Sequence, residues 1–590
     1  MAATLFKKVD YSLSKLIQDI DQGEIGLPDI QRPFVWKLTQ VRDLFDSIYK
    51  GFPVGYLLFW SNAYSNNLRQ IGTNAKQTKV PRLLIVDGQQ RLTSLYAVLK
   101  NHHVLTEDFK ETSIKIAFRP KDANFEVTDA AIIKDPEYIT DISQLWSGEI
   151  SRNRFVKNFL DKLKTNHELS EEEEDLICEN IDRLYDLQNY PFTAMEISHT
   201  VNEEDVSDIF VRINSKGVTL KQADFILTLL SVFWDEGRAE LETFSRECRR
   251  PPTDASKPSP FNHFIQPDPD QLLRVCVGLG FKRARLQHVY SILRGKDLET
   301  EEFSDERREM QFGVLKEAQK KSLDLTHWHE FMKVLVRAGF RGGNMITSQT
   351  GFLYSYVMFL IGKHDYNIDP YKLRNVMARW FFMTALTGRY TSSPETIMES
   401  DLARLRGVKN ADEFIDTLDQ IIQDTLTEDY WDITLVNELQ TSSARTPTIF
   451  AYYAALNLID ANVLFSKMKV SELLDPALKT KKSATERHHL YPKAYLEKIG
   501  INEVMDTNQV ANYALVEWDD NISISDQPPK EYFPIYAKRL SQEELKRMME
   551  WHALPDGWEQ MEYPTFLAER RKLISKIIRK GFEKLKITKE

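Results

Sequence analysis

Cysteine is scarce in this chain of 590 residues, and its scarcity already excludes several classes of protein. The three cysteines, Cys178, Cys248 and Cys276, are far apart and form no CxxC pair. This spacing excludes a disulfide framework and a cysteine-ligated zinc site, and it is typical of a reducing compartment. We therefore expect a cytoplasmic protein.

Long hydrophobic runs and targeting signals are also missing. The longest apolar stretch, residues 352–361, falls well short of the ~20 residues that a membrane span requires. Residues 1–10 contain no apolar run followed by a small-residue cleavage site, so we expect no secretory signal. The sequence thus predicts a soluble protein without a membrane partner.

The chain carries no excess of positive charge. Its net charge is −10, while its charged fraction of 28% and hydrophobic fraction of 42% are ordinary for a folded soluble protein. An acidic balance argues against a protein that coats DNA indiscriminately, so any contact with nucleic acid must come from local basic patches. The sequence also contains no Walker A motif, internal repeat or low-complexity tract.

The length exceeds what one hydrophobic core usually supports, so we expect several domains. The predicted fold class is a multidomain α+β protein. We divide it into residues 1–235, a mixed α/β domain; 236–470, a helical connecting region; 471–560, a small domain around a histidine pair; and 561–590, a basic C-terminal helix. The proline-rich segment 249–260 is interpreted as a linker.

Local patterns support the mixed α/β domain. Apolar residues recur at helical spacing over residues 13–20 and again over residues 92–99. Residues 56–60 and 83–86 are short, fully apolar runs, which are typical of strands buried on both faces. The sequence therefore predicts a buried sheet covered by helices.

A strand-to-helix turn in this domain predicts a phosphate site. The second apolar run ends at Asp87-Gly88, and a helix is expected to begin at Gln89-Gln90-Arg91. Gly88 permits a tight turn and a close approach to a ligand, and the helix start offers unpaired N–H groups. Arg91 can grip phosphate oxygens while Asp87 orients it. The plain alternative is a buried polar turn in which Asp87 neutralises Arg91.

The second candidate site begins at the sequence His488-His489-Leu490-Tyr491-Pro492. A histidine near neutral pKa can accept a proton from water at cellular pH, which suits His489 as a general base. His488 would point to the other side of a strand and can ligate a metal. Farther along, Asn512 can fix the tautomer of His489, and Asn521 can complete the metal site.

This set of residues is typical of nucleases of the HNH, or ββα-metal, kind. Its oxygen and imidazole donors suit Mg²⁺ or Mn²⁺. The alternative is a histidine pair that merely caps a strand in the core. The proline and the two asparagines, in this order, favour the nuclease.

The C-terminal motif resembles the HNH domain at the end of GmrSD-like Type IV restriction enzymes. The family's histidine motif is matched by residues 488–492, and its two asparagine positions are matched by Asn512 and Asn521. The resemblance implies that this end of the chain cuts DNA with a divalent metal.

The N-terminal signatures resemble the first module of the same family. They are residues 30–36, 87–91 and 210–217. In the family, that module resembles the ParB/sulfiredoxin fold and binds and hydrolyses nucleoside triphosphates. For this chain, the resemblance implies GTP, CTP, UTP or ATP as the nucleotide. The resemblance adds Arg32 and Asn214 as expected pocket residues.

The function that the resemblance implies is a modification-dependent DNA endonuclease of anti-phage defence, regulated by a nucleotide. Its partners would be modified double-stranded DNA and a second copy of the chain. Three alternatives stay open: a nucleotide-triggered nicking toxin, a phosphorothioate-sensing nuclease, and a ParB-like DNA-binding switch without nuclease activity. The residues do not decide which DNA modification is recognised.

Overall fold

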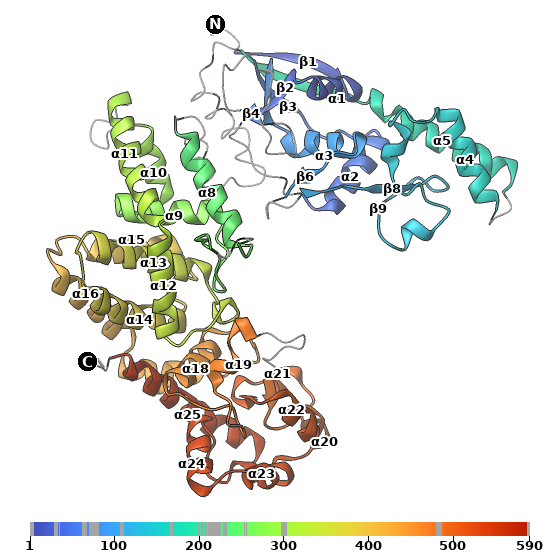
Figure 1. Cartoon of the computed structure of the whole chain (residues 1–590). Coiled ribbons are helices and arrows are strands. Elements are labelled where there is room, and N and C mark those ends of the chain that lie inside the picture. Colours follow the sequence, from blue (N-terminus) through green and yellow to red (C-terminus); the bar gives the residue numbers. More distant parts are fainter. Residues whose placement is uncertain are drawn as a thin grey trace. The chain divides into compact units, whose positions relative to one another are not determined.

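The computed structural model describes residues 5–28, 34, 36–61, 68–69, 82–106, 111–165, 169–198, 201, 206, 209, 223, 226–227, 230, 233–252, 254, 256–296, 304–478 and 487–586. The chain divides into two compact units, Met1–Arg238 and Ala239–Glu590 (Figure 1). The predicted division into four parts is finer than these two units, and its boundaries stay predictions.

The first unit is built on a mixed sheet. Among the described residues, six strands pair in the order β1-β10-β3-β5-β2-β4. Their bounds are β1 Phe6–Ser12, β2 Ile25–Pro28, β3 Leu57–Ser61, β4 Leu68–Arg69, β5 Leu83–Asp87 and β10 Pro191–Ile197. The pairs β10–β3 and β2–β5 are parallel, and the others are antiparallel. Because β1 pairs with β10, the beginning and the end of this unit are joined in one sheet.

Both faces of this sheet are buried, which explains the fully apolar strands. Leu57 and Phe59 of β3 join one hydrophobic cluster, while Leu58 and Trp60 join a second cluster on the other face. Alternate residues of β5 divide in the same way. The two strands predicted from residues 56–60 and 83–86 are thus confirmed.

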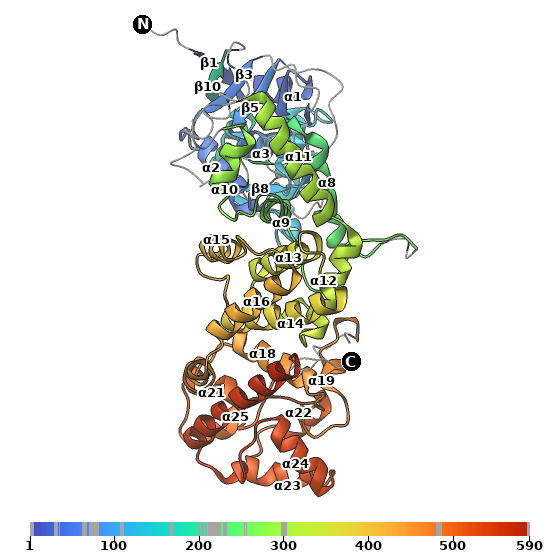
Figure 2. The same cartoon turned by 90° about the vertical axis from the view of Figure 1, so that its left-hand side faces the viewer.

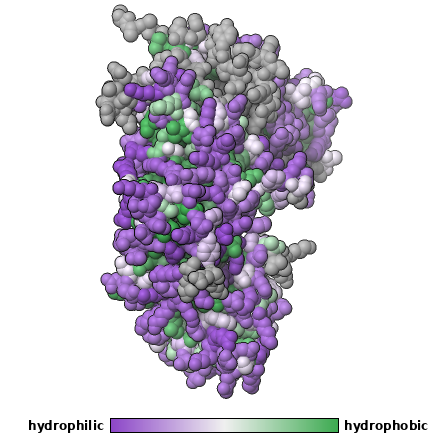
Figure 3. Space-filling model, turned by 60° about the vertical axis from the view of Figure 1, so that its left-hand side comes forward, coloured by the Kyte–Doolittle hydropathy of each residue, from purple (hydrophilic) through white to green (hydrophobic). Residues whose placement is uncertain are grey.

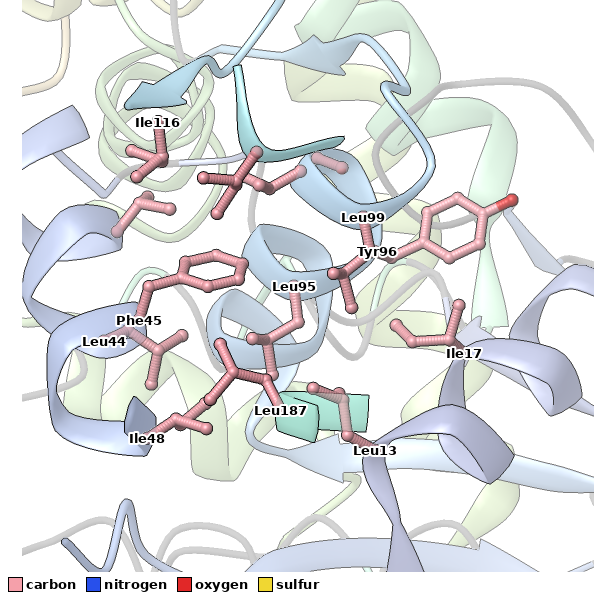
Figure 4. Packing of buried hydrophobic residues seen from close by; sticks show 14 of the residues in the cluster. Leu13, Ile17, Leu44, Phe45, Ile48, Leu95, Tyr96, Leu99, Ile116 and Leu187 are labelled. Atoms are coloured by element: carbon pink, nitrogen blue, oxygen red, sulfur yellow. The ribbon is translucent and has the colours of Figure 1, made fainter. Parts of the chain in front are cut away.

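In the part of the chain that the structure describes, five helices contribute to the hydrophobic cluster that includes the first of these faces. They are α1 Leu13–Asp21, α2 Leu38–Tyr49, α3 Gln89–Leu99, α4 Arg152–Lys164 and α5 Glu171–Tyr185. The short strand pairs β6 Val104–Leu105 with β7 Glu111–Thr112 and β8 Ile116–Arg119 with β9 Asn124–Val127 complete the unit. Figure 4 shows side chains of α1, α2 and α3, among them Ile17, Phe45 and Leu95, packed together in the core. The two helical patterns predicted here are confirmed.

The first part of the second unit is helical, as predicted. Its helices are α8 Asp235–Cys248, α9 Pro269–Phe281, α10 Leu286–Leu293, α11 Asp305–Ser322, α12 Leu325–Arg337, α13 Gln349–His364, α14 Pro370–Thr387, α15 Pro394–Arg404, α16 Ala411–Thr425, α17 Leu435–Glu438, α18 Pro447–Leu458 and α19 Val470–Leu473. α13 is buried along almost its whole length, since α9, α12 and α14 pack around it. No helix within the described ranges is long and apolar enough to cross a membrane.

The rest of the second unit holds a two-stranded hairpin surrounded by helices. The strands are β11 Arg487–His489 and β12 Tyr513–Leu515, and the helices are α20 Lys493–Lys498, α21 Val504–Thr507, α22 Trp518–Ile524, α23 Pro529–Ala537, α24 Gln542–Trp551 and α25 Tyr563–Lys584. α18 and α25 lie side by side in both views (Figures 1 and 2). Gly581 permits this contact, because a Cβ there would lie 2.6 Å from Ala455 Cα.

The surface in Figure 3 is mainly hydrophilic, with hydrophobic residues in small groups. Scattered apolar residues are normal on a soluble protein surface.

Candidate functional site

The predicted histidine motif lies on the hairpin of the second unit. β11 and β12 are antiparallel, and His488 and His489 are opposite Ala514 and Tyr513 respectively. The backbone N–H of Leu490 donates to the Asn512 carbonyl at 2.8 Å and extends the pairing by one step. Neighbouring residues on a strand face opposite sides, so the two imidazoles are presented to different surroundings.

The side chain of His488 points into the interior of the second unit and contacts Asn521. Its side chain lies in a site that leaves the residue only 3% exposed, and its Nδ1 is 2.8 Å from Asn521 Oδ1. Burial lowers the pKa of His488 to about 4, so the ring is neutral at neutral pH. Within the described residues, His488 Nε2 has no hydrogen-bond partner. The structure therefore brings together the two residues predicted to bind a metal.

Asn521 is reached through the helix that follows the hairpin. α22 begins at Trp518 and carries Asn521 in its first turns, partly exposed. Its neighbour Asp520 is 2.8 Å from Arg539 Nη1, and the Arg539 guanidinium lies 4.2 Å from the centre of the Tyr536 ring. Asp520 is thus held by an ion pair beside the predicted metal ligands.

The donor set at this point is small. Within the described ranges, no group of three or more His, Cys, Asp or Glu side chains is arranged to hold a metal ion. The amide oxygen fits Mg²⁺ or Mn²⁺, because these ions prefer oxygen donors and retain several water ligands, and the imidazole would add one nitrogen donor to such a set. The chemistry of the two side chains is compatible with the predicted ion.

His489 has a partner that the sequence did not reveal. Its Nε2 lies 3.0 Å from Asn508 Oδ1, and its ring meets the Tyr513 ring at 5.0 Å. Burial lowers the pKa of His489 from its ordinary value, although the Asn508 contact opposes this effect. Asn508 follows α21 directly and lies between His489 and Asn512 in the chain. It belongs to no motif, so no sequence pattern predicts its contact with His489.

Asn512 does not make the contact that was expected of it. We predicted a hydrogen bond to His489; instead, Asn512 Oδ1 accepts from the Tyr491 N–H at 2.8 Å. Its Nδ2 donates to the carbonyls of Tyr491 at 3.0 Å and Thr507 at 3.3 Å. Asn512 directly precedes β12 and is fully buried. Its amide therefore joins the backbone at Tyr491, just after the histidine strand, to the backbone at Thr507, the residue before Asn508.

A buried arginine ties the C-terminal helix to this hairpin. Arg570 of α25 is 0% exposed, and its Nη1 donates to the Ala511 carbonyl at 2.7 Å. Its Nη2 donates to the His552 carbonyl at 3.1 Å. Burial lowers the pKa of Arg570 from its ordinary value. α25 thus holds the backbone directly before Asn512.

The predicted phosphate turn is formed as expected at the level of the backbone. β5 ends at Asp87, and α3 begins at Gln89 after Gly88, whose φ is +93°. A Cβ at Gly88 would lie 2.4 Å from Leu57 Cδ2, so only glycine fits this turn without a shift. Gln89 and Gln90 occupy the first turn of α3 and are partly exposed.

The Arg91 guanidinium is engaged by the protein itself. Nη1 donates to the Val54 carbonyl at 2.5 Å, and Nη2 donates to the Tyr56 carbonyl at 2.8 Å. Asp87 Oδ2 is 3.3 Å from Nη2. Burial lowers the pKa of Arg91, while Asp87 opposes this shift. In this arrangement Arg91 braces the loop before β3. The other two expected pocket residues, Arg32 and Asn214, lie outside the described residues.

Comparison with known proteins supports a GmrSD-like family. Residues 13–231 match the family described as GmrSD restriction endonuclease, N-terminal domain. That part of the chain is similar to the GmrSD N-terminal domain. The match contains the strands β2, β3, β4, β5 and β10 of the sheet, α3 and the turn at residues 87–91, and it ends before the second unit.

A second similarity covers more of the chain. An uncharacterized protein of Methanocaldococcus jannaschii is 23% identical over 551 residues, which span 88% of this chain and 86% of that protein. An alignment of this length includes parts of both units.

Proposed function

We propose that this chain is a DNA endonuclease whose cleavage centre is the His488–His489 hairpin. Two pairs of side chains at one hairpin carry the proposal. The buried, neutral imidazole of His488 has the amide oxygen of Asn521 beside it, and the imidazole of His489 contacts the amide of Asn508. The GmrSD-like domain supports a restriction-endonuclease type of role, with DNA as the substrate.

In this proposal His488 and Asn521 hold Mg²⁺ or Mn²⁺. A bound divalent ion supplies charge stabilisation to the phosphate and to the leaving oxygen. His488 is suited to binding because its low pKa keeps the ring neutral, the form in which an imidazole nitrogen offers a lone pair. Asn521 adds an oxygen donor from the start of α22, close to the carboxylate of Asp520.

His489 is the proposed general base. The low pKa that burial gives it keeps the ring neutral at cellular pH, and a neutral imidazole can take a proton from the attacking water. Asn512 supports it indirectly, because its amide fixes Tyr491, two residues beyond His489. In this assignment His489 is the general base, His488 is the metal ligand, and Asn512 supports the backbone.

The first unit is the proposed sensor and regulator. Its turn Asp87-Gly88-Gln89-Gln90 leads into the start of α3, where the positive end of the helix dipole favours an anion such as a nucleoside triphosphate. Gln89 and Gln90 are partly exposed in the first turn of α3, and they are the candidates for direct contact with the phosphates. A ParB/sulfiredoxin-like fold, Arg32 and Asn214 belong to the same proposal.

The proposed substrate is modified double-stranded DNA, as in Type IV restriction. A net charge of −10 supports a gated nuclease, because weak non-specific affinity for DNA spares unmodified sequences. The proposed biological role is defence against phage, and the proposed regulator is GTP, CTP, UTP or ATP.

The test is cleavage of matched DNA substrates by the full chain. Glucosylated, phosphorothioate and unmodified DNA of one sequence are each incubated with Mg²⁺ or Mn²⁺, with and without each nucleotide. We expect cleavage of one modified substrate only, abolished by a chelator. Equal cleavage of all three would indicate a toxin-like nuclease, and binding without cleavage would indicate a ParB-like switch.

A paired experiment tests the regulatory turn. Replacement of Gln89 and Gln90 by alanine leaves the Arg91 brace in place, so the fold should persist while the nucleotide response is lost. The control is replacement of Gln18, which lies on α1 and outside the turn. This variant should keep the nucleotide response of the original chain. An unaltered nucleotide response in the Gln89/Gln90 variant would contradict this part of the proposal.

A further inference from the structure

Asn508 occupies a position from which it can control the chemistry of His489. Its Oδ1 lies 3.0 Å from His489 Nε2, a normal hydrogen-bond distance. Among the described residues, no other hydrogen bond to the His489 ring is formed. The inference drawn from this contact rests on the proposed function of the hairpin as a nuclease centre.

Asn508 is held in place from two directions. The carbonyl of Thr507, the residue before it, accepts a hydrogen bond from the buried Asn512 amide at 3.3 Å. The Tyr563 hydroxyl at the start of α25 donates to the Asp506 carbonyl at 2.9 Å. The hairpin and the terminal helix thus both bond to the backbone just before Asn508.

The direction of this hydrogen bond decides what the ring can do. A neutral imidazole carries one proton, so one ring nitrogen donates and the other accepts. An amide oxygen on Nε2 retains the proton there and leaves the lone pair on Nδ1. An amide N–H on Nε2 would place the proton on Nδ1 and occupy the accepting nitrogen, so that neither nitrogen could act as a base.

We propose that Asn508 is a positioning residue that fixes the Nε2–H tautomer of His489 and makes Nδ1 the nitrogen that accepts the proton of the attacking water. The role that the motif suggested for Asn512 is thereby divided. Asn508 sets the tautomer, and Asn512 sets Asn508 through the Thr507 carbonyl. Removal of a partner that orients a metal-bound histidine commonly changes activity roughly 10–100-fold, and we expect a similar effect for the partner of the general base.

The first experiment compares two replacements of nearly equal size. Asn508→Leu removes the acceptor, and Asn508→Asp keeps an oxygen acceptor in the same place. We expect Asn508→Leu to lower kcat for DNA cleavage roughly 10–100-fold with little change in KM, and Asn508→Asp to restore most of the activity. Asn502→Leu, at an exposed site just before α21, is the control and should leave kcat unchanged.

The second experiment reads the tautomer without any activity. In the full chain labelled with ¹⁵N-histidine, at a pH of about 8 where an ordinary histidine is neutral, His489 should show a protonated Nε2 and an unprotonated Nδ1. The His489 signals are assigned by their loss in His489→Ala. In Asn508→Leu the ring should change to a mixture of both tautomers. A purely structural role would leave the tautomer as it is.

The outcomes separate this inference from the proposed function. A wild-type His489 with the proton on Nδ1, or an unchanged tautomer in Asn508→Leu, overturns the inference and leaves the nuclease in place. Full activity in His489→Ala overturns the proposed function itself. If Asn508→Leu does not fold, the wild-type tautomer and the activity of Asn508→Asp still decide.

Discussion

At the scale of single residues, the geometry of the hairpin depends most on the buried amide of Asn512. It is fully buried and bonds to both backbone groups of Tyr491 and to the Thr507 carbonyl. The Tyr491 side chain is anchored in turn, since its hydroxyl donates to the carbonyls of Trp558 and Met561. The Asn512 amide thus connects the histidine strand to the Asn508 turn, and the Tyr491 hydroxyl connects that strand to the segment before α25.

We predict that Asn512→Ala destabilises the second unit by about 3 kcal/mol, because it leaves the buried Tyr491 N–H and two carbonyls without their partner. Urea unfolding of this unit measures the change. Asn502→Ala, at an exposed position, should remain within about 0.5 kcal/mol of the original chain. Equal unfolding midpoints for the two variants would contradict the structural role of Asn512.

A second buried residue predicts how stability depends on pH. His552 is 0% exposed, its Nε2 is 2.9 Å from the Asn462 carbonyl, and burial lowers its pKa from 6.5 to about 4. A histidine whose folded pKa is lowered favours folding while it is neutral. This contribution is therefore present above about pH 6.5 and is lost as the pH falls toward 4.

We expect the unfolding free energy of the second unit to fall by on the order of 3 kcal/mol across this range through His552 alone. Urea titrations between pH 8 and pH 4 measure it. His552→Gln has no titrating ring, so its unfolding free energy should decline less over the same range. An identical decline in both proteins would show that His552 does not contribute.

At the scale of elements, the sequence predicted the helices and strands that have periodic apolar residues, but it did not predict how irregular segments pack. The helix over residues 13–20 and the strands over residues 56–60 and 83–86 follow from apolar periodicity and are present. The segment 249–260 was interpreted as a linker from its prolines. In the structure, Pro260 and Ser259 carbonyls accept bonds from Trp328 and His329 of α12. Composition reveals the lack of regular structure, but it does not reveal packing.

The candidate site was predictable in part for the same reason. Residue types at motif positions identified His488, His489 and Asn521, and the structure brings His488 and Asn521 into contact. The partner of His489 was not predictable, because Asn508 reaches it through the path of a loop. The same holds for Arg570, whose link to the Ala511 carbonyl depends on how α25 packs.

The contact between α18 and α25 gives a prediction with a matched control. Gly581→Ala would place a methyl group 2.6 Å from Ala455 Cα, so the two helices must separate. We expect a loss of about 1–3 kcal/mol. Gly313→Ala on α11 has no atom within 4 Å of the new methyl group, and it should stabilise by roughly 0.5–1 kcal/mol. Thermal unfolding of both variants measures the effects, and a shift of the same sign in both would contradict the close packing.

At the scale of the whole molecule, a unit that is similar to the GmrSD N-terminal domain precedes a unit that carries the hairpin. The family match covers only the first unit, so the assignment of cleavage to the second unit depends on the geometry of the hairpin. In the proposed function, the first unit regulates and the second unit cleaves. A single centre of this kind cuts one strand at a time, so two strands require two chains or two successive nicks.

The most direct test of the nuclease centre is strand cleavage by His489→Ala beside His288→Ala, a matched change at an exposed histidine on α10. Both full chains are incubated with Mg²⁺ or Mn²⁺ and a supercoiled plasmid that carries the modification cut by the original chain. We expect His288→Ala to produce nicked circles and His489→Ala to produce none while it still binds the DNA. Equal nicking by the two variants would contradict the assignment of cleavage to the hairpin.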